Sequence, residues 1–72
     1  MEEFINNFAD QFDETERTEF NIDTKFKDLD EWDSMIALSI IAMVDEEYDV
    51  TINGDHIKNA NTLKDLYDLI NS

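Results

Sequence analysis

The sequence predicts an all-α fold, a small four-helix bundle with three longer helices, one short helix and a long first loop. The chain contains no proline and a single glycine, Gly54, whereas a β-sandwich or barrel needs many tight turns. Apolar residues instead recur at helical spacing in several segments. A hydrophobic content of 42%, with five phenylalanines, is too high for a disordered tail. The 72 residues therefore form one small domain, 1–72.

The first helix is expected over residues 2–13, because Ile5, Phe8 and Phe12 recur at helical spacing. Glu2 and Glu3 fall in its first turn, where the helix dipole favours negative charge. A long polar loop then runs to residue 33, and a short helical turn can form inside it. We expect spaced apolar side chains to anchor this loop to the core: Phe20, Ile22, Phe26, Leu29 and Trp32.

The second helix is expected over residues 34–48, and it is apolar on nearly all sides. One stripe contains Ala37, Ile41, Val44 and Tyr48, and further apolar residues surround it: Met35, Ile36, Leu38, Ile40 and Met43. A domain of this size can hardly enclose a helix completely, so part of this surface is expected to face a partner.

Two more helices follow a strong turn signal, Asn53-Gly54. The third, short helix is expected over residues 55–60. The fourth is expected over residues 62–71, where Thr62 and Asp65 have the spacing of a capping box. Its apolar stripe consists of Leu63, Leu66, Tyr67 and Ile70.

The charge of the chain excludes several classes of partner. Nineteen acidic residues face five basic ones, for a net charge of −14, which disfavours nucleic acids and anionic membranes and favours basic protein partners. The chain has no cysteine, which fits a reducing compartment. The start MEEFINNF lacks a basic signal-peptide region, and the apolar run 35–44 is too short to span a bilayer. We therefore expect a cytoplasmic protein.

Neither a metal site nor an active site is predicted. An EF-hand loop beginning at Asp49 would place Ala60 where the bidentate glutamate belongs, and one beginning at Asp28 fails at Trp32 and Ser39. His56, the single histidine, has no evident partner that would orient it as a catalytic base. The chain is therefore expected to bind no metal and to catalyse no reaction.

Ser34 is the residue with two open roles. Either Asp33 or Ser34 can be an N-cap that satisfies free N–H groups at the helix start. Alternatively, the Ser34 hydroxyl is accessible to a modifying enzyme, and a phosphate there would face those N–H groups and the positive end of the dipole. Nearby Asp30, Glu31 and Asp33 oppose further negative charge, so the position permits modification without requiring it.

The segment FKDLDEWDSMIALSIIAMVDEEYDVTI, residues 26–52, resembles the phosphopantetheine-attachment region of the acyl carrier proteins, a family that includes peptidyl and aminoacyl carriers. The centre of the likeness is Asp33-Ser34 followed by a large apolar residue. The likeness runs from about Ile22 to Ile70, and acidic, aromatic and aliphatic residues recur downstream at the family's positions: Asp45 to Tyr48, Ile52, Thr62 and Leu63.

This resemblance implies an acyl-carrier-like bundle that works as a non-catalytic monomer. Ser34 would carry 4′-phosphopantetheine, attached from coenzyme A by a phosphopantetheinyl transferase, and the thiol of that arm would hold acyl groups as thioesters. Basic patches of acyl-transferring or acyl-modifying enzymes would meet the acidic second helix. The residues implied in partner recognition are Asp33, Met35, Ile36, Leu38, Asp45 and Glu46.

Departures from the family pattern leave the cargo open. A fatty-acid carrier usually has acidic residues two and five places after the serine, where this chain has Ile36 and Ser39, and Asp30 replaces a common glycine. A carrier for a specialised fatty-acid or polyketide-type pathway is expected, with a peptidyl or aminoacyl carrier as the alternative. A different class, an unmodified acidic adaptor for a basic protein, would not need the Ser34 hydroxyl.

Overall fold

Four α-helices and two short 3-10 helices make up the structure, a computed structural model that describes residues 2–71. The α-helices are α1 (Glu2–Ala9), α2 (Ser34–Tyr48), α3 (Gly54–Asn59) and α4 (Leu63–Ile70), and the 3-10 helices are Arg17–Glu19 and Phe26–Asp28. No strand occurs among the described residues. The predicted all-α fold, with three longer helices and one short helix, is therefore confirmed. Met1 and Ser72, the ends of the expected domain, lie outside the described residues.

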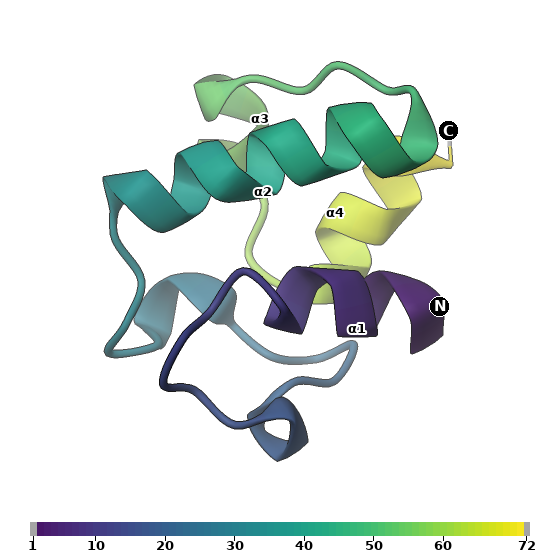
Figure 1. The fold of residues 1–72 in the computed structure, drawn as a ribbon. Helices are drawn as coiled ribbons and strands as arrows, with labels where there is room; N and C mark the ends of the chain where they lie inside the picture. Colours follow the sequence, from purple (N-terminus) through teal and green to yellow (C-terminus); the bar gives the residue numbers. More distant parts are fainter. Residues whose placement is uncertain (1, 72) are drawn as a thin grey trace.

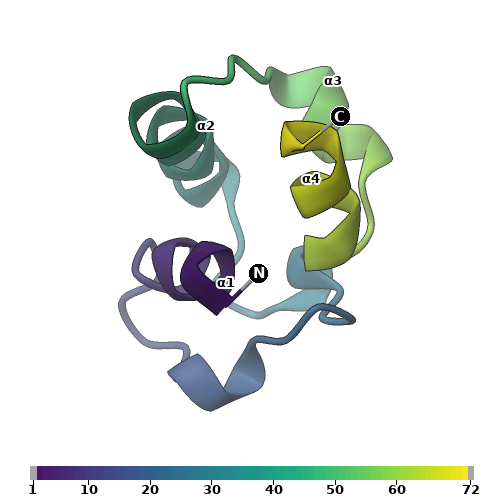
Figure 2. The same cartoon turned by 90° about the vertical axis from the view of Figure 1, so that its right-hand side faces the viewer.

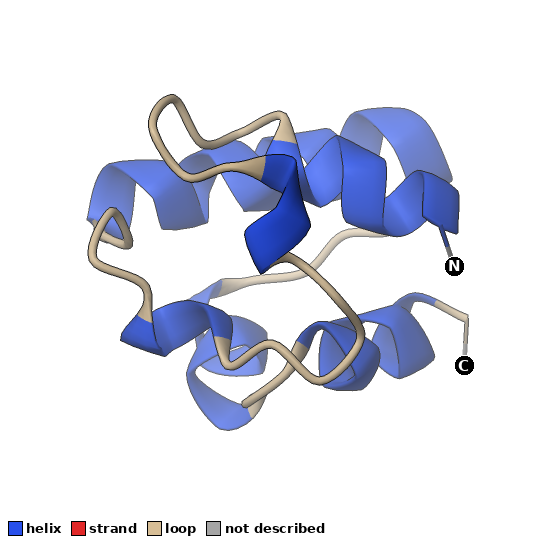
Figure 3. Cartoon of the chain, turned by 90° about the horizontal axis from the view of Figure 1, so that it is seen from below, coloured by secondary structure: helices blue, strands red, loops and turns tan. Residues whose placement is uncertain are grey.

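The helices form two pairs around a shared interior. Helices α1 and α2 lie on one side, and α3 and α4 lie on the other, as the end-on view shows (Figure 1 and Figure 2). In Figure 1 the long connection between α1 and α2 crosses below this arrangement, with Arg17–Glu19 at its lowest point, and Figure 3 shows the same connection from below. This connection therefore closes one side of the bundle and leads directly into α2.

Aromatic side chains dominate the core. The Phe8 ring is fully buried, and its centroid lies 5.5 Å from that of Phe26 and 5.6 Å from that of Phe12. Phe20 packs against the same group, 5.0 Å from Phe12, so the connection contributes to the core along with the helices. The buried residues come from all four helices, from the connection and from the two later loops: Phe4, Ile5, Phe8, Ala9, Phe12, Phe20, Phe26, Ile40, Met43, Val44, Ile52, Ile57, Ala60, Leu63, Leu66 and Ile70.

Helix α1 is shorter than the 2–13 range expected from its apolar spacing. It ends at Ala9, and the next turn is tighter, because the N–H groups of Gln11 and Phe12 donate to carbonyls only three residues earlier. The N–H groups of residues 13–15 then donate to a side chain, that of Glu31, so they cannot continue the helix. Phe12 still reaches the core from this tight turn.

The boundaries of the other helices are set by their caps. Helix α2 begins at Ser34, as expected. Asn53 caps α3 and Thr62 caps α4, and the predicted Thr62–Asp65 capping box is present. Helices α3 and α4 therefore span 54–59 and 63–70 rather than the expected 55–60 and 62–71. No helix within residues 2–71 combines the length and hydropathy needed to cross a bilayer.

Backbone hydrogen bonds attach the long connection to α4. The N–H groups of Leu63 and Lys64 donate to the carbonyls of Thr24 and Ile22, at 3.3 and 3.0 Å. Among the expected anchors, Phe20 and Phe26 are buried, and Leu29 and Trp32 pack partly buried against the core. Ile22 differs, because its side chain is 36% exposed and its backbone carbonyl makes the attachment instead.

Candidate functional site

Ser34 is the first residue of α2, and its side chain is exposed. Its hydroxyl makes no hydrogen bond to any of residues 2–71. The N-cap is Asp33, which has an extended backbone and whose Oδ1 accepts from the N–H of Ile36 at 2.8 Å. Of the two residues that could cap the helix, Asp33 therefore does so, and the exposed Ser34 hydroxyl has no partner among residues 2–71.

The start of α2 fits a phosphate bonded to Ser34. Within the described chain, the N–H groups of Ser34 and Met35 have no acceptor, and the first turn contains no acidic residue. The positive end of a 15-residue helix dipole adds to their attraction for an anion. The opposing charges are those of Asp33 and the acidic residues before it. The exposed hydroxyl offers the oxygen on which a phosphodiester would form, and the two N–H groups would favour its negative charge.

The segment entering α2 is held by two of its side chains. Residues 29–32 form a turn in which the Trp32 N–H donates to the Leu29 carbonyl at 3.0 Å. The Trp32 ring packs edge-on against Phe26, with centroids 5.0 Å apart, and stacks on Phe12 at 6.3 Å. The Glu31 carboxylate contacts residues 13–15 of the turn that follows α1.

The Glu31 carboxylate accepts four hydrogen bonds. Oε2 accepts from the Asp13 N–H at 2.7 Å, and Oε1 accepts from the N–H groups of Glu14 and Thr15 at 3.0 and 2.9 Å and from the Thr15 hydroxyl at 2.8 Å. Partial burial raises the pKa of Glu31, but these bonds outweigh that effect, so the pKa lies below its ordinary value. Sequence reasoning missed this role, because Glu31 is one of several similar acidic residues before Ser34.

Apart from Asp33, which is the N-cap, the residues expected to recognise partners lie along α2 in two groups. Met35 and Leu38, one turn apart, are 71% and 63% exposed and form an apolar surface next to Ser34. Ile36 differs from them, because it is partly buried and packs against the core. Asp45 and Glu46 are exposed near the other end of α2. They lie about 17 to 18 Å along the helix axis from Ser34, at about 1.5 Å per residue.

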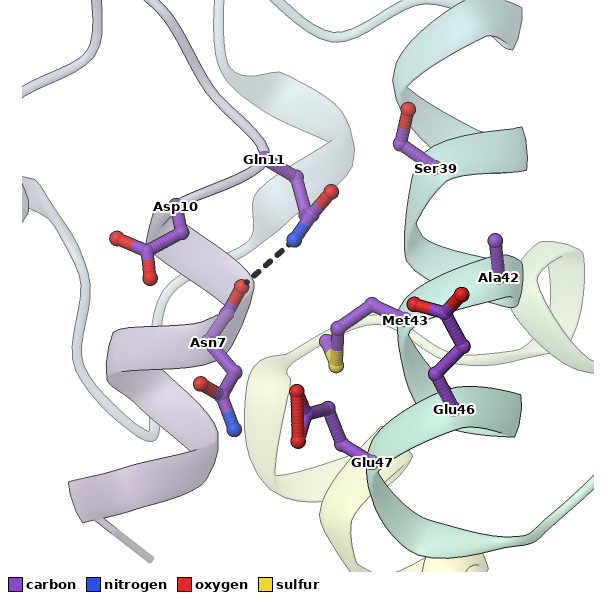
Figure 4. A pocket seen from close by; sticks show the side chains of 8 residues that line it. All are labelled: Asn7, Asp10, Gln11, Ser39, Ala42, Met43, Glu46 and Glu47. Carbon is purple, nitrogen blue, oxygen red and sulfur yellow. Dashed lines mark hydrogen bonds between the residues drawn. The ribbon is translucent and has the colours of Figure 1, made fainter.

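A groove of about 260 Å³ lies between α1 and α2 (Figure 4). Gln11 Nε2 donates to the Asn7 carbonyl at 3.2 Å, and Asn7 Nδ2 donates to the Tyr48 hydroxyl at 3.2 Å. No basic residue is among those lining the groove: Asn7, Asp10, Gln11, Ser39, Ala42, Met43, Glu46 and Glu47. Ser34 does not line this groove, which instead continues the acidic surface around Glu46.

The other candidate sites have structural roles. Asp49 ends α2 in the left-handed conformation, at φ 55° and ψ 34°, and Asn53 caps α3. His56 completes that capping box, since its Nδ1 accepts from the Asn53 N–H at 3.0 Å. No group of three or more His, Cys, Asp or Glu side chains within residues 2–71 is arranged to hold a metal ion.

Comparison with known protein families places these features in context. The family model described as the phosphopantetheine attachment site matches residues 2–70, which is nearly the whole chain. No curated protein and no solved structure gives a significant match. Domains of this family carry a covalently attached 4′-phosphopantetheine, and the all-helical fold and the exposed serine at the start of α2 fit that group. The chain belongs to the phosphopantetheine-attachment family, the domain family of the acyl carrier proteins.

Proposed function

We propose that the chain is an acyl carrier whose Ser34 oxygen is joined to 4′-phosphopantetheine through a phosphodiester. The supporting observation is the exposed Ser34 hydroxyl at the start of α2, which has no hydrogen-bond partner within residues 2–71, while Asp33 caps the helix. A phosphopantetheinyl transferase would remove the hydroxyl proton, and the serine oxygen would displace the adenosine bisphosphate part of coenzyme A. The thiol at the end of the arm supplies the thioester chemistry that a chain without cysteine cannot provide.

The second part of the proposal is that partner enzymes contact two surfaces of α2. Met35 and Leu38 form the apolar contact beside the attachment point, where their exposed side chains would lose water on binding. Asp33, Asp45 and Glu46 supply negative charge for basic patches on the partner. Ile36, although partly buried, supports this surface from the core side.

The cargo that fits this surface best is an acyl chain of a specialised fatty-acid or polyketide-type pathway. The position two residues after Ser34 is Ile36 and the position five residues after it is Ser39, so the first turns of α2 present no acidic residue. Partner enzymes that bind an apolar surface on these turns would differ from partner enzymes that bind a carboxylate there. A peptidyl or aminoacyl carrier has the same attachment chemistry and remains the alternative.

Intact-mass measurement tests the attachment. Wild-type protein incubated with coenzyme A and a promiscuous phosphopantetheinyl transferase should gain one phosphopantetheine unit. Ser34→Ala should gain none and keep its helical circular dichroism. Ser39→Ala is the matched control, because Ser39 is also an exposed serine on α2, and this variant should be modified like the wild type.

Two results would contradict the proposal. One is that the wild type gains no mass with several transferases, which would favour an unmodified acidic adaptor. The other is that Ser34→Ala is still modified. Once the arm is attached, loading with a panel of acyl and aminoacyl groups by candidate ligases separates the two cargo classes.

A further inference from the structure

We propose that Glu31 is a positioning residue for the modification of Ser34. Its carboxylate holds the turn that follows α1 and so fixes the direction in which the chain enters α2. This inference rests on the proposed function, because it concerns the rate at which the transferase uses the Ser34 hydroxyl. The observation behind this inference is that the Glu31 side chain, three residues before Ser34, accepts four hydrogen bonds.

Each of the three residues before Ser34 is held by a different contact. Glu31 is bonded to the backbone of residues 13–15, Trp32 is packed between aromatic rings, and Asp33 is bonded to the first turn of α2. Ser34 itself has no side-chain bond within the described residues. The position of its hydroxyl is therefore determined by the path of the chain that leads to it.

Glu31 and Trp32 restrict that path in different ways. The Trp32 ring is anchored by non-directional packing, which leaves the segment free to pivot about the ring. Glu31 adds directional hydrogen bonds to three consecutive backbone N–H groups, and these bonds require a defined backbone geometry in both segments. Because the side chains of neighbouring residues diverge, the two anchors together fix an orientation that either one alone would leave open.

The turn that Glu31 holds belongs to the α1 end of the fold, 16 to 18 residues earlier in the sequence. The side chain therefore connects the turn that follows α1 to the segment that enters α2. Without this contact, the aromatic anchors remain, including the stack of Trp32 on Phe12, but residues 13–15 lose their hydrogen bonds to the segment entering α2.

Substitution by glutamine weakens this contact with little change in shape, because it removes only the bond accepted by Oε2. A glutamine carbonyl at the Oε1 position can still accept from Glu14 and Thr15. Its amide nitrogen would face the Asp13 N–H, so a charge-assisted bond of 2.7 Å would become a contact between two donors. Asp30→Asn is the matched control, because Asp30 is adjacent, exposed and equally charged, and it makes no hydrogen bond within residues 2–71.

Steady-state kinetics of phosphopantetheine transfer test the proposal. In Glu31→Gln, kcat should fall roughly tenfold, because small misplacements of a reacting group have large effects on rate. KM should stay within about twofold, because the exposed surface of α2 that binds the transferase is unchanged. Thr15→Val, which removes only the hydroxyl bond of 2.8 Å, should show a smaller fall in kcat.

Further readouts separate the possible outcomes. Amide hydrogen exchange should speed up at residues 13–15 in Glu31→Gln and remain unchanged in Asp30→Asn. Kinetics are compared at a temperature where circular dichroism shows every variant to be folded. Equal kcat in wild type and Glu31→Gln would overturn the role of Glu31 and leave the carrier function intact. An unmodified wild type would instead refute the proposed function.

Discussion

Replacing Asp33 by alanine should destabilise the protein, although this residue is exposed on the surface. The change removes the acceptor for the Ile36 N–H, a bond of 2.8 Å at the start of the longest helix. Loss of an N-cap costs about 1 kcal/mol. For a domain of 60–100 residues, that energy corresponds to a decrease in melting temperature of roughly 4–8 °C.

Two neighbouring variants separate capping from charge. Asp33→Asn removes the charge but keeps a capping oxygen of similar quality, so its melting temperature should lie close to that of the wild type. Ser34→Ala should not lower the melting temperature, because the hydroxyl has no partner within residues 2–71. Alanine is also the better helix former, by at most about 0.5 kcal/mol.

Thermal unfolding followed by circular dichroism gives all three values under one set of conditions. Buffers of moderate ionic strength limit the contribution of general charge repulsion in a chain of net charge −14. The assignment of the cap to Asp33 would be wrong if Ser34→Ala lowered the melting temperature as much as Asp33→Ala. It would also be wrong if the melting temperature of Asp33→Asn were as low as that of Asp33→Ala.

Two further predictions concern charge and pH. Reversing Asp45 and Glu46 to lysine should slow association with the cognate transferase and flatten its salt dependence, measured by stopped flow. Reversing Glu16 and Asp23 on the long connection serves as the charge-matched control, and equal effects would argue against a local surface. Because the pKa of Glu31 is lowered, its stabilising contribution is complete above the ordinary glutamate value of about 4.3 and is lost as the pH falls through the lowered value. The midpoint of urea unfolding should therefore fall less steeply with decreasing pH in Glu31→Gln than in the wild type, and identical slopes would contradict the pKa assignment.

The fold and the start of α2 could be predicted because they depend on local patterns. Apolar spacing located the four helices, and the run that begins at Met35 indicated where the longest helix starts. The Thr62–Asp65 capping box depends on only four residues, and it is present. Patterns of this kind need no knowledge of distant parts of the chain.

Features that depend on distant contacts could not be predicted. Helix α1 ends early because the amides of residues 13–15 are bonded to Glu31, and nothing in the sequence near Phe12 reveals this competition. Likewise, Ile36 and Met35 are equally apolar in sequence, yet only the packing of the bundle decides that Met35 is exposed and Ile36 is partly buried. Whether Asp33 or Ser34 caps α2 depended on side-chain geometry alone.

The attachment of the long connection to α4 has a consequence for the order of events during synthesis. Ile22 and Thr24 accept hydrogen bonds from residues that lie about 40 positions later in the chain. Closing a loop of that length is slow compared with forming a helix turn, and it cannot begin until residues 63 and 64 have left the ribosome. The path leading to Ser34 is therefore completed late, so a nascent chain should be a poor substrate for the modifying enzyme until α4 has emerged.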